Sequence, residues 1–302
     1  MRFLSIIRYS NLIMLALFQA VIWFYLLEQY QVPKSVSDYI FIVHILATLF
    51  IAASGNIIND IYDLEIDQIN KPHQIWIPNL MSLKKAWSFY ISLNVLGLIA
   101  GFWVSWELNK IWFWGLYLIP VFLLFLYAIR LKKVIYLNNM LVAGLIAYSL
   151  FLAFELALVG ENSVHYYIGN YGFSLLETIR FILLFAFILN WIREIVKDAE
   201  DVIGDRANGV NSLPSNYGLE YTKNGLKLIT FFLLGILLSI AISNRIDQKI
   251  FVLYLILAVG MSLIIFVKQL KFAHQPKDYH KISILLKIIM LIGFFSVFLI
   301  RI

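Results

Sequence analysis

The chain has 302 residues, of which 62% are hydrophobic and only 14% charged, whereas about a quarter of the residues of a soluble domain are charged. Cysteine is absent, which excludes disulfides, thiolate metal sites and a cysteine nucleophile. The net charge of +6 does not indicate nucleic acid as a partner, because the cations lie in short segments between apolar runs.

Nine apolar segments are long enough to cross a membrane, which takes roughly 20 residues in a helix. The first follows Arg2 and Arg8 and lacks a small-residue cleavage site, so it predicts a membrane anchor rather than a signal peptide. Lipid offers the backbone no hydrogen bonds, so all nine are predicted to be helices of one membrane domain, residues 1–302. The expected spans are residues 11–28, 39–58, 86–106, 111–129, 139–159, 178–192, 226–243, 250–267 and 283–300.

The distribution of Lys and Arg predicts how the chain is oriented. One side of the membrane receives the amino terminus and the loops after the second, fourth, sixth and eighth spans. That side holds 18 of the 24 cations and the other side holds six. The richer side is therefore predicted to be cytoplasmic, with the carboxyl terminus outside. It includes two long polar loops, residues 59–85 and 193–225.

Both long loops carry three aspartates at identical spacing. Offsets of three and four residues place each triplet on one face of a helix that continues a membrane span. Six carboxylates at one membrane face repel each other unless cations neutralise them. Magnesium accepts carboxylate oxygens and is usually shared with substrate phosphates, so it is the expected ion. The predicted metal ligands are Asp60, Asp63, Asp67, Asp198, Asp201 and Asp205.

Basic residues near both triplets would neutralise the remaining oxygens of a bound polyanion. These cations are Lys71, Lys132, Lys133 and Arg193. The pattern indicates a diphosphate bridged to the protein by metal, with an apolar tail that enters the bilayer. Acidic helix caps at a membrane surface are the simpler interpretation of one triplet, but two matched triplets beside cations favour a site. A topology signal explains Lys132 and Lys133 equally well when they are considered alone.

At these motifs the sequence resembles the UbiA superfamily of intramembrane prenyltransferases. The first motif matches the family's Asn-x-x-x-Asp-x-x-x-Asp pattern at Asn59, Asp63 and Asp67, and the second matches Asp-x-x-x-Asp at Asp201 and Asp205. The segment that contains Tyr127, Lys132, Lys133 and Asn139 is similar to the family's stretch between its fourth and fifth helices. Residues 193–214 are most similar to the geranylgeranylglyceryl phosphate geranylgeranyltransferase branch.

The resemblance implies a nine-helix bundle that encloses a lipid-accessible chamber under a cytoplasmic cap. It implies magnesium-dependent transfer of a polyprenyl group from its diphosphate to an acceptor, with Asp60 and Asp198 supporting the other four aspartates. Asp63 and Asp67 are implied to be catalytic, Asp67 as the proton acceptor. The ring of Tyr127 is implied to stabilise the allylic cation. The implied diphosphate ligands are Asn59, Lys71, Lys132, Lys133, Asn139, Arg193 and Lys197.

Several functions remain open. The 193–214 segment predicts geranylgeranylglyceryl phosphate as acceptor, whereas an aromatic acceptor would indicate quinone synthesis. Gln74 and Asn211 stand where family members often carry cations, which keeps open a catalytically degenerate isoprenoid-binding protein. A cation or lipid transporter is the alternative from another class, but a transport path needs polar residues that continue through the spans.

Overall fold

The computed structural model describes residues 5–70, 72, 77, 79–159, 175–243 and 249–300. Every regular element in these residues is helical, which confirms the all-α prediction. Nine helices in this part of the chain are long and apolar enough to cross a membrane, and each overlaps one predicted span. Their bounds are Tyr9–Gln29, Asp38–Tyr62, Leu83–Glu107, Ile111–Ile129, Leu137–Leu158, Leu175–Glu200, Leu219–Ile242, Lys249–Phe272 and Pro276–Leu299.

The prediction of a short sixth span, residues 178–192, is wrong. Helix α9 runs over Leu175–Glu200 and therefore includes the beginning of the second aspartate motif. The charged residues after position 192 lower the hydropathy without weakening the helix, because Arg, Glu, Lys and Ala are good helix formers. As a result, Arg193 and Glu194 are buried side chains of a helix rather than members of a polar loop.

The chain divides into two compact units. The first comprises residues 1–27, 31–134 and 148–161, and the second comprises residues 28–30, 135–147 and 162–302. Helix α8 (Leu137–Leu158) contributes to both. The other main helices of the first unit are α2 (Tyr9–Val21), α4 (Asp38–Tyr62), α5 (Leu64–Asn70), α6 (Leu83–Glu107) and α7 (Gly115–Ile129). A single domain over residues 1–302 and the cytoplasmic cap stay predictions.

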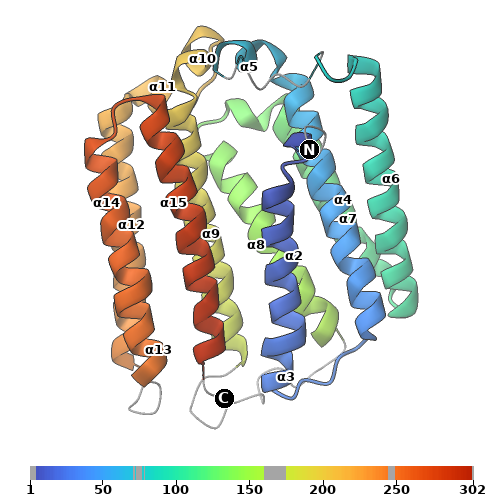
Figure 1. The fold of residues 1–302 in the computed structure, drawn as a ribbon. Helices are drawn as coiled ribbons and strands as arrows, with labels where there is room; N and C mark the ends of the chain where they lie inside the picture. Colours follow the sequence, from blue (N-terminus) through green and yellow to red (C-terminus); the bar gives the residue numbers. More distant parts are fainter. Residues whose placement is uncertain are drawn as a thin grey trace. The chain divides into compact units, whose positions relative to one another are not determined.

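Helix α4 is the central element of the first unit, where it packs along α6 and also against α2 and α7 (Figure 1). Gly97 permits the close approach of α6, because an added Cβ would lie 2.8 Å from Ile51 Cγ1 and 3.2 Å from the Ala47 carbonyl oxygen. Near the end of α4 that carries the first motif, Ile57 belongs to an apolar cluster that also contains Ile6. This packing holds the turn of α4 from which the aspartates project.

Polar side chains within the first unit also connect its helices. The Nδ1 atom of His44 on α4 lies 2.7 Å from the Tyr117 hydroxyl on α7. Gln19 on α2 donates to the Thr48 hydroxyl at 3.1 Å and to the Ser149 carbonyl oxygen at 3.3 Å. Such contacts are strongly favoured inside a span, because lipid supplies no alternative partner for a buried polar group.

Helix α9 is the central element of the second unit, where it packs against α15 (Pro276–Phe295) and α12 (Leu219–Ser243). Gly293 permits the contact with α15, because a Cβ there would collide with the ring of Phe185. Two short helices follow α9, namely α10 (Val202–Ala207) and α11 (Leu213–Tyr217). The remaining described span of the unit, Lys249–Phe272, contains both α13 (Lys249–Tyr254) and α14 (Met261–Phe272). The second motif therefore continues a helix that is packed along its length.

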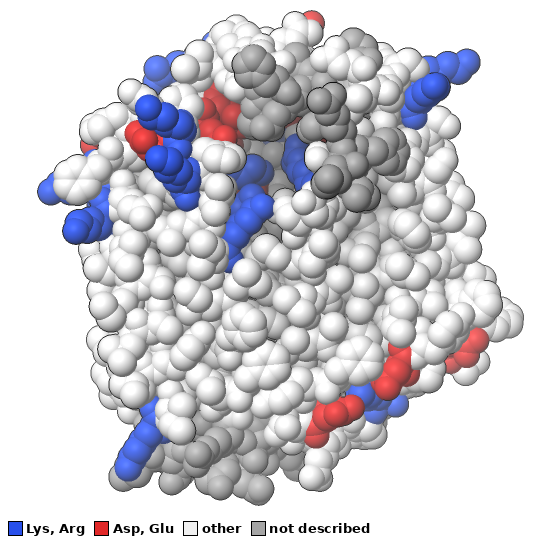
Figure 2. All heavy atoms as spheres, in the orientation of Figure 1, with Lys and Arg blue, Asp and Glu red and all other residues white. Residues whose placement is uncertain are grey.

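Charged side chains gather toward the two ends of the helices, whereas most of the surface between them is uncharged in the face shown by Figure 2. This distribution matches the aqueous ends and apolar middle of membrane spans. With the nine long apolar helices, it identifies the chain as an integral membrane protein.

The orientation is testable with single cysteines, because the chain has none of its own. Ile69→Cys and Ile203→Cys introduce exposed reporters beside the two motifs, and Trp106→Cys introduces one near the opposite end of α6. The excess of cations on the motif side predicts that a membrane-impermeant maleimide added to intact cells labels only Trp106→Cys. Labelling of Ile69→Cys and Ile203→Cys from opposite sides of the membrane would contradict a shared site.

Candidate functional site

The first aspartate motif lies across a break between two helices. Helix α4 ends at Tyr62, Asp63 has φ −98° and ψ 9°, and α5 begins at Leu64. Hydrogen bonds still run from Asp63 N to Asn59 O at 2.9 Å and from Asp67 N to Asp63 O at 2.8 Å. The prediction of one continuous helix is therefore wrong, although these contacts keep the helical spacing through the break.

The second motif has the same backbone. Helix α9 ends at Glu200, Asp201 has φ −92° and ψ 6°, and α10 begins at Val202. Asp201 N donates to Lys197 O at 2.9 Å, and Asp205 N donates to Asp201 O at 3.1 Å. The middle aspartate of each motif thus occupies the sparsely populated bridge region of φ/ψ space, where many active-site residues are found.

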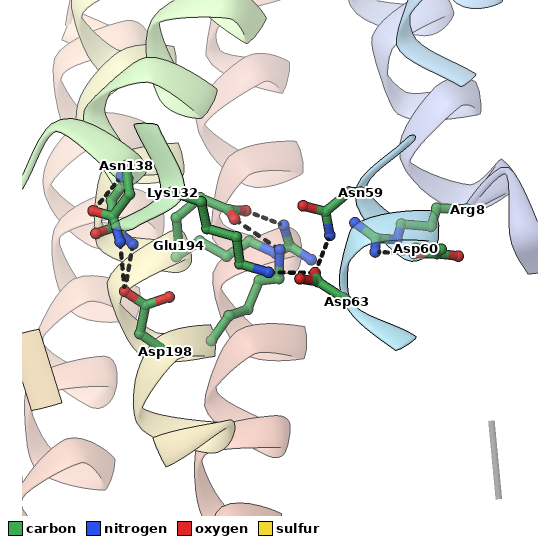
Figure 3. Close-up of polar contacts among 11 residues, drawn as sticks. Arg8, Asn59, Asp60, Asp63, Lys132, Asn138, Glu194 and Asp198 are labelled. Atoms are coloured by element: carbon green, nitrogen blue, oxygen red, sulfur yellow. Dashed lines mark hydrogen bonds and ion pairs between the residues drawn. The ribbon is translucent and has the colours of Figure 1, made fainter. Parts of the chain in front are cut away.

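Each aspartate at the end of α4 is held by a cation (Figure 3). Asp63 accepts a hydrogen bond from Asn59 Nδ2 at 2.6 Å and another from Lys132 Nζ, which comes from the turn Leu131–Lys133 after α7. Asp60 accepts from a guanidinium nitrogen of Arg8 at 2.9 Å. Asp60 is 8% exposed and Asp63 6%, so these partners supply the compensation that a buried carboxylate requires.

Asparagine side chains hold the first aspartate of the second motif (Figure 3). Asp198 accepts a hydrogen bond from Asn139 Nδ2 at 2.8 Å and a longer one from Asn138 Nδ2 at 3.5 Å. The side-chain oxygen of Asn138 in turn accepts from the Asn139 backbone nitrogen at 2.7 Å, which fixes the pair at the beginning of α8. The partner observed for Asn139 is therefore an aspartate, and its role toward a diphosphate stays a prediction.

Glu194 was not predicted as a site residue, yet it contacts two that were. Its Oε1 atom accepts from Arg193 at 3.2 Å and its Oε2 atom accepts from Lys197 at 2.7 Å. The side chains of Arg193 and Glu194 are each 10% exposed. Glu194 therefore orients two predicted diphosphate ligands on α9. The spacing of Glu194 and Lys197, three residues apart on a helix, is a sequence signal that identifies such a pair.

Arg8 and Asn138 were also missed. In the sequence, Arg8 is one of many cations predicted for its side of the membrane. Its partner Asp60 is 52 positions away, so no local pattern connects the two residues. Asn138 lies in the first turn of α8, and its partner Asp198 is 60 positions away, so no local pattern connects these two residues either.

The remaining predicted residues differ in exposure. Asp205 is buried on α10, whereas Lys133 is exposed beside the half-buried Lys132. The half-buried members of the set are Asp67, Tyr127, Lys197 and Asp201. The predictions for Lys71 and Gln74 fall outside the described residues.

The side chains around each motif suit a magnesium ion in their chemistry. Among the described residues, no three His, Asp or Glu side chains are gathered closely enough to hold a metal by themselves. However, the side-chain oxygens of Asn59 and Asn139 are buried and find no hydrogen-bond donor in the described part of the chain. A buried oxygen without a donor is costly, and a hard cation would satisfy it. The amide nitrogen of each asparagine already donates to a motif aspartate, Asn59 to Asp63 and Asn139 to Asp198. A carboxylate and an amide oxygen are therefore close enough to serve as neighbouring ligands of one cation.

Known proteins resemble this chain over most of its length. A profile of the UbiA prenyltransferase family matches residues 17–294. A digeranylgeranylglyceryl phosphate synthase from Methanocaldococcus jannaschii is 30% identical over 292 residues, which cover 95% of this chain and 92% of that protein. A second protein of that name, from Methanococcus aeolicus, is 36% identical over 195 residues. This alignment covers 64% of the chain and 61% of the relative, less than two thirds of its length.

The fold also has a solved counterpart. The structure of a UbiA homologue from Archaeoglobus fulgidus, bound to DMAPP and Mg2+, matches with a TM-score of 0.65. The match covers 99% of this chain and all of that one, at 16% sequence identity. The likeness at this identity shows a shared fold rather than a shared ligand.

The two adjacent lysines after α7 provide a matched test of the first motif. Lys132→Met leaves Asp63 buried without its cation. In EDTA, this change should lower the free energy of unfolding by about 1.5 kcal/mol. That value is the low end for a charged hydrogen bond, because Lys132 is partly exposed. Magnesium should recover part of this loss by replacing the cation. Thermal unfolding in detergent measures both effects, and Lys133→Met is the control. An equal loss in the control, or a loss that magnesium does not alter, would contradict the assignment.

Proposed function

Because the chain belongs to the UbiA prenyltransferase family, we propose that it transfers a polyprenyl group from a prenyl diphosphate to geranylgeranylglyceryl phosphate, a step of ether-lipid synthesis. The name shared by the two relatives is the observation that carries the choice of acceptor. The similarity of residues 193–214 to the same branch supports that choice.

The acceptor brings a phosphate of its own, so it needs cations beyond those used by the donor. Arg206 on α10 lies one residue after the last aspartate of the second motif, and its guanidinium donates to the Pro214 carbonyl oxygen at 3.1 Å. Lys223 on α12 is almost fully buried and contacts Glu220 at 2.8 Å. These two cations, with the basic residues between 268 and 281, are the proposed ligands of the acceptor phosphate.

Both aspartate motifs are proposed to serve one donor diphosphate. Magnesium held by Asp63, Asp67, Asp201 and Asp205 would neutralise the charge that develops on the leaving diphosphate. Other diphosphate oxygens accept hydrogen bonds from basic and amide side chains near the motifs. That set is Asn59, Lys71, Lys132, Lys133, Asn139, Arg193 and Lys197, with Asp60 and Asp198 in supporting positions.

In the proposed reaction, the bond between the allylic carbon and the diphosphate oxygen breaks, and the acceptor hydroxyl forms a new carbon–oxygen bond. Asp67 takes the proton that the hydroxyl loses. The ring of Tyr127, near the end of α7, stabilises the positive charge on the carbon. The apolar spans exclude water, which would otherwise trap the cation as a free alcohol.

The motif aspartates should be essential for turnover. Asp63→Asn and Asp201→Asn each remove a negative charge while keeping the shape, so we expect the turnover number to fall at least about a hundredfold. Chelation of divalent cations should abolish activity in the parent protein. Glu65→Gln is the control, because Glu65 is an exposed acid on α5 outside the proposed ligand set. Near-normal activity of either aspartate variant would remove that residue from the metal site.

An assay in which three acceptors compete for the same donor identifies the acceptor. Purified protein with magnesium and geranylgeranyl diphosphate is offered geranylgeranylglyceryl phosphate, 4-hydroxybenzoate and a dihydroxynaphthoate together, and products are identified by mass spectrometry. We expect a doubly prenylated glyceryl phosphate. Prenylation of an aromatic ring alone would assign the chain to quinone synthesis, and the absence of any product in the presence of all three acceptors would contradict the proposed reaction.

A further inference from the structure

Residues 5–8, called here the N-terminal clip, lie against the motif end of α4. The Ile6 side chain is fully buried in the apolar cluster that contains Ile57. The carbonyl oxygen of Ile7 accepts a hydrogen bond from Asn56 Nδ2 at 2.9 Å. The clip is therefore attached to α4 by apolar packing and by a hydrogen bond from the Asn56 side chain to the clip backbone, in addition to any interaction between charges.

Arg8 completes the clip with an ion pair. Its guanidinium lies 2.9 Å from Asp60, and the side chains are 38% and 10% exposed. The backbone of Arg8 is left-handed, with φ 53° and ψ 50°, and its carbonyl oxygen accepts from Asn11 N at the beginning of α2. A residue other than glycine rarely adopts this conformation unless its surroundings enforce it. Here the reversal of the chain at Arg8 directs Ile6 into the core and the guanidinium toward Asp60.

The end of α4 presents two neighbouring rows of side chains. Asn56 and Asp60 are four residues apart and contact the clip, whereas Asn59 and Asp63 are four residues apart and contact each other and Lys132. Asp60 and Asp63 are three residues apart and lie on the same side of the helix, yet their observed partners differ, because Asp60 contacts Arg8 and Asp63 contacts Lys132. Figure 3 shows the same division, with Asp60 turned to Arg8 and Asp63 turned to Lys132.

We propose that Arg8 is a positioning residue for the transfer reaction and that Asp60 is its partner rather than a metal ligand. Helix α4 ends two residues after Asp60, and the last turn of a helix frays unless something holds it. The Arg8–Asp60 pair holds that turn from one side and thereby fixes the direction in which Asn59 and Asp63 project. The effect on turnover rests on the proposed function, whereas the attachment of the clip does not.

Cysteine labelling tests the clip without any assay of catalysis. Ile6→Cys is the buried reporter in the otherwise cysteine-free chain, and Ser5→Cys is a second reporter in case the first impairs folding. Adding Arg8→Gln or Asp60→Asn should raise the rate of maleimide labelling about tenfold, because a charged hydrogen bond is lost. Arg8→Lys should give a smaller increase, and Lys84→Ala, which removes an exposed cation of α6, should give none. Unchanged labelling in both Arg8→Gln and Asp60→Asn would overturn the proposal.

Steady-state kinetics test the effect on the reaction. Arg8→Gln and Asp60→Asn should each lower kcat about tenfold, and the double variant should be no worse than the more affected single variant, because both changes break one contact. The magnesium concentration for half-maximal activity should stay within about twofold of the parent value. A large increase of that concentration in Asp60→Asn alone would make Asp60 a metal ligand and overturn its assignment to the clip. If the parent protein transfers no prenyl group, the proposed function fails, and the labelling result still decides the clip.

Discussion

A buried carboxylate near the end of a membrane span is stable only where a cation or a hydrogen-bond donor reaches it, and most of the described site follows from this requirement. Asp63 has Lys132, Asp60 has Arg8, and Asp198 has a pair of asparagines. Each partner belongs to a different element of the same unit, so charge compensation also determines which elements must meet at the motif. The same contacts therefore neutralise the aspartates and pack the ends of the helices.

The break at the middle aspartate is the second shared feature of the motifs. Asp63 and Asp201 have nearly equal backbone angles. In each motif, backbone hydrogen bonds between residues four positions apart continue through the break. The first aspartate of each motif consequently belongs to a long packed span, and the third belongs to a short helix beyond it. A rigid span holds its side chains within narrow limits, which the proposed binding site for a metal and a diphosphate would require. The short helices α5 and α10 carry Asp67 and Asp205 at the same register.

Prenyl transfer places opposite demands on its surroundings. The diphosphate needs cations and acidic metal ligands, whereas the prenyl chain needs an apolar region from which water is excluded. The separation of charged helix ends from largely uncharged helix middles supplies both environments in one chain (Figure 2). Within the first unit, the N-terminal clip and Lys132 approach the last turn of α4 from neighbouring rows of its side chains. A residue such as Arg8, which contacts neither the donor nor the acceptor in the proposed reaction, can therefore still affect the rate.

The sequence by itself determined the helical class, the nine spans and the two aspartate motifs, because hydropathy and residue spacing are local properties. It also predicted the prenyltransferase family from those motifs. Hydropathy alone ended the sixth span at residue 192, because charged helix formers resemble a loop on that scale, whereas α9 is packed as far as Glu200. The breaks at Asp63 and Asp201 depend on how each chain segment leaves its span, and the pairing of Arg8 with Asp60 joins residues 52 positions apart. Only the packing of helices decides which cation reaches which carboxylate, because that choice depends on distances between elements that no local pattern contains.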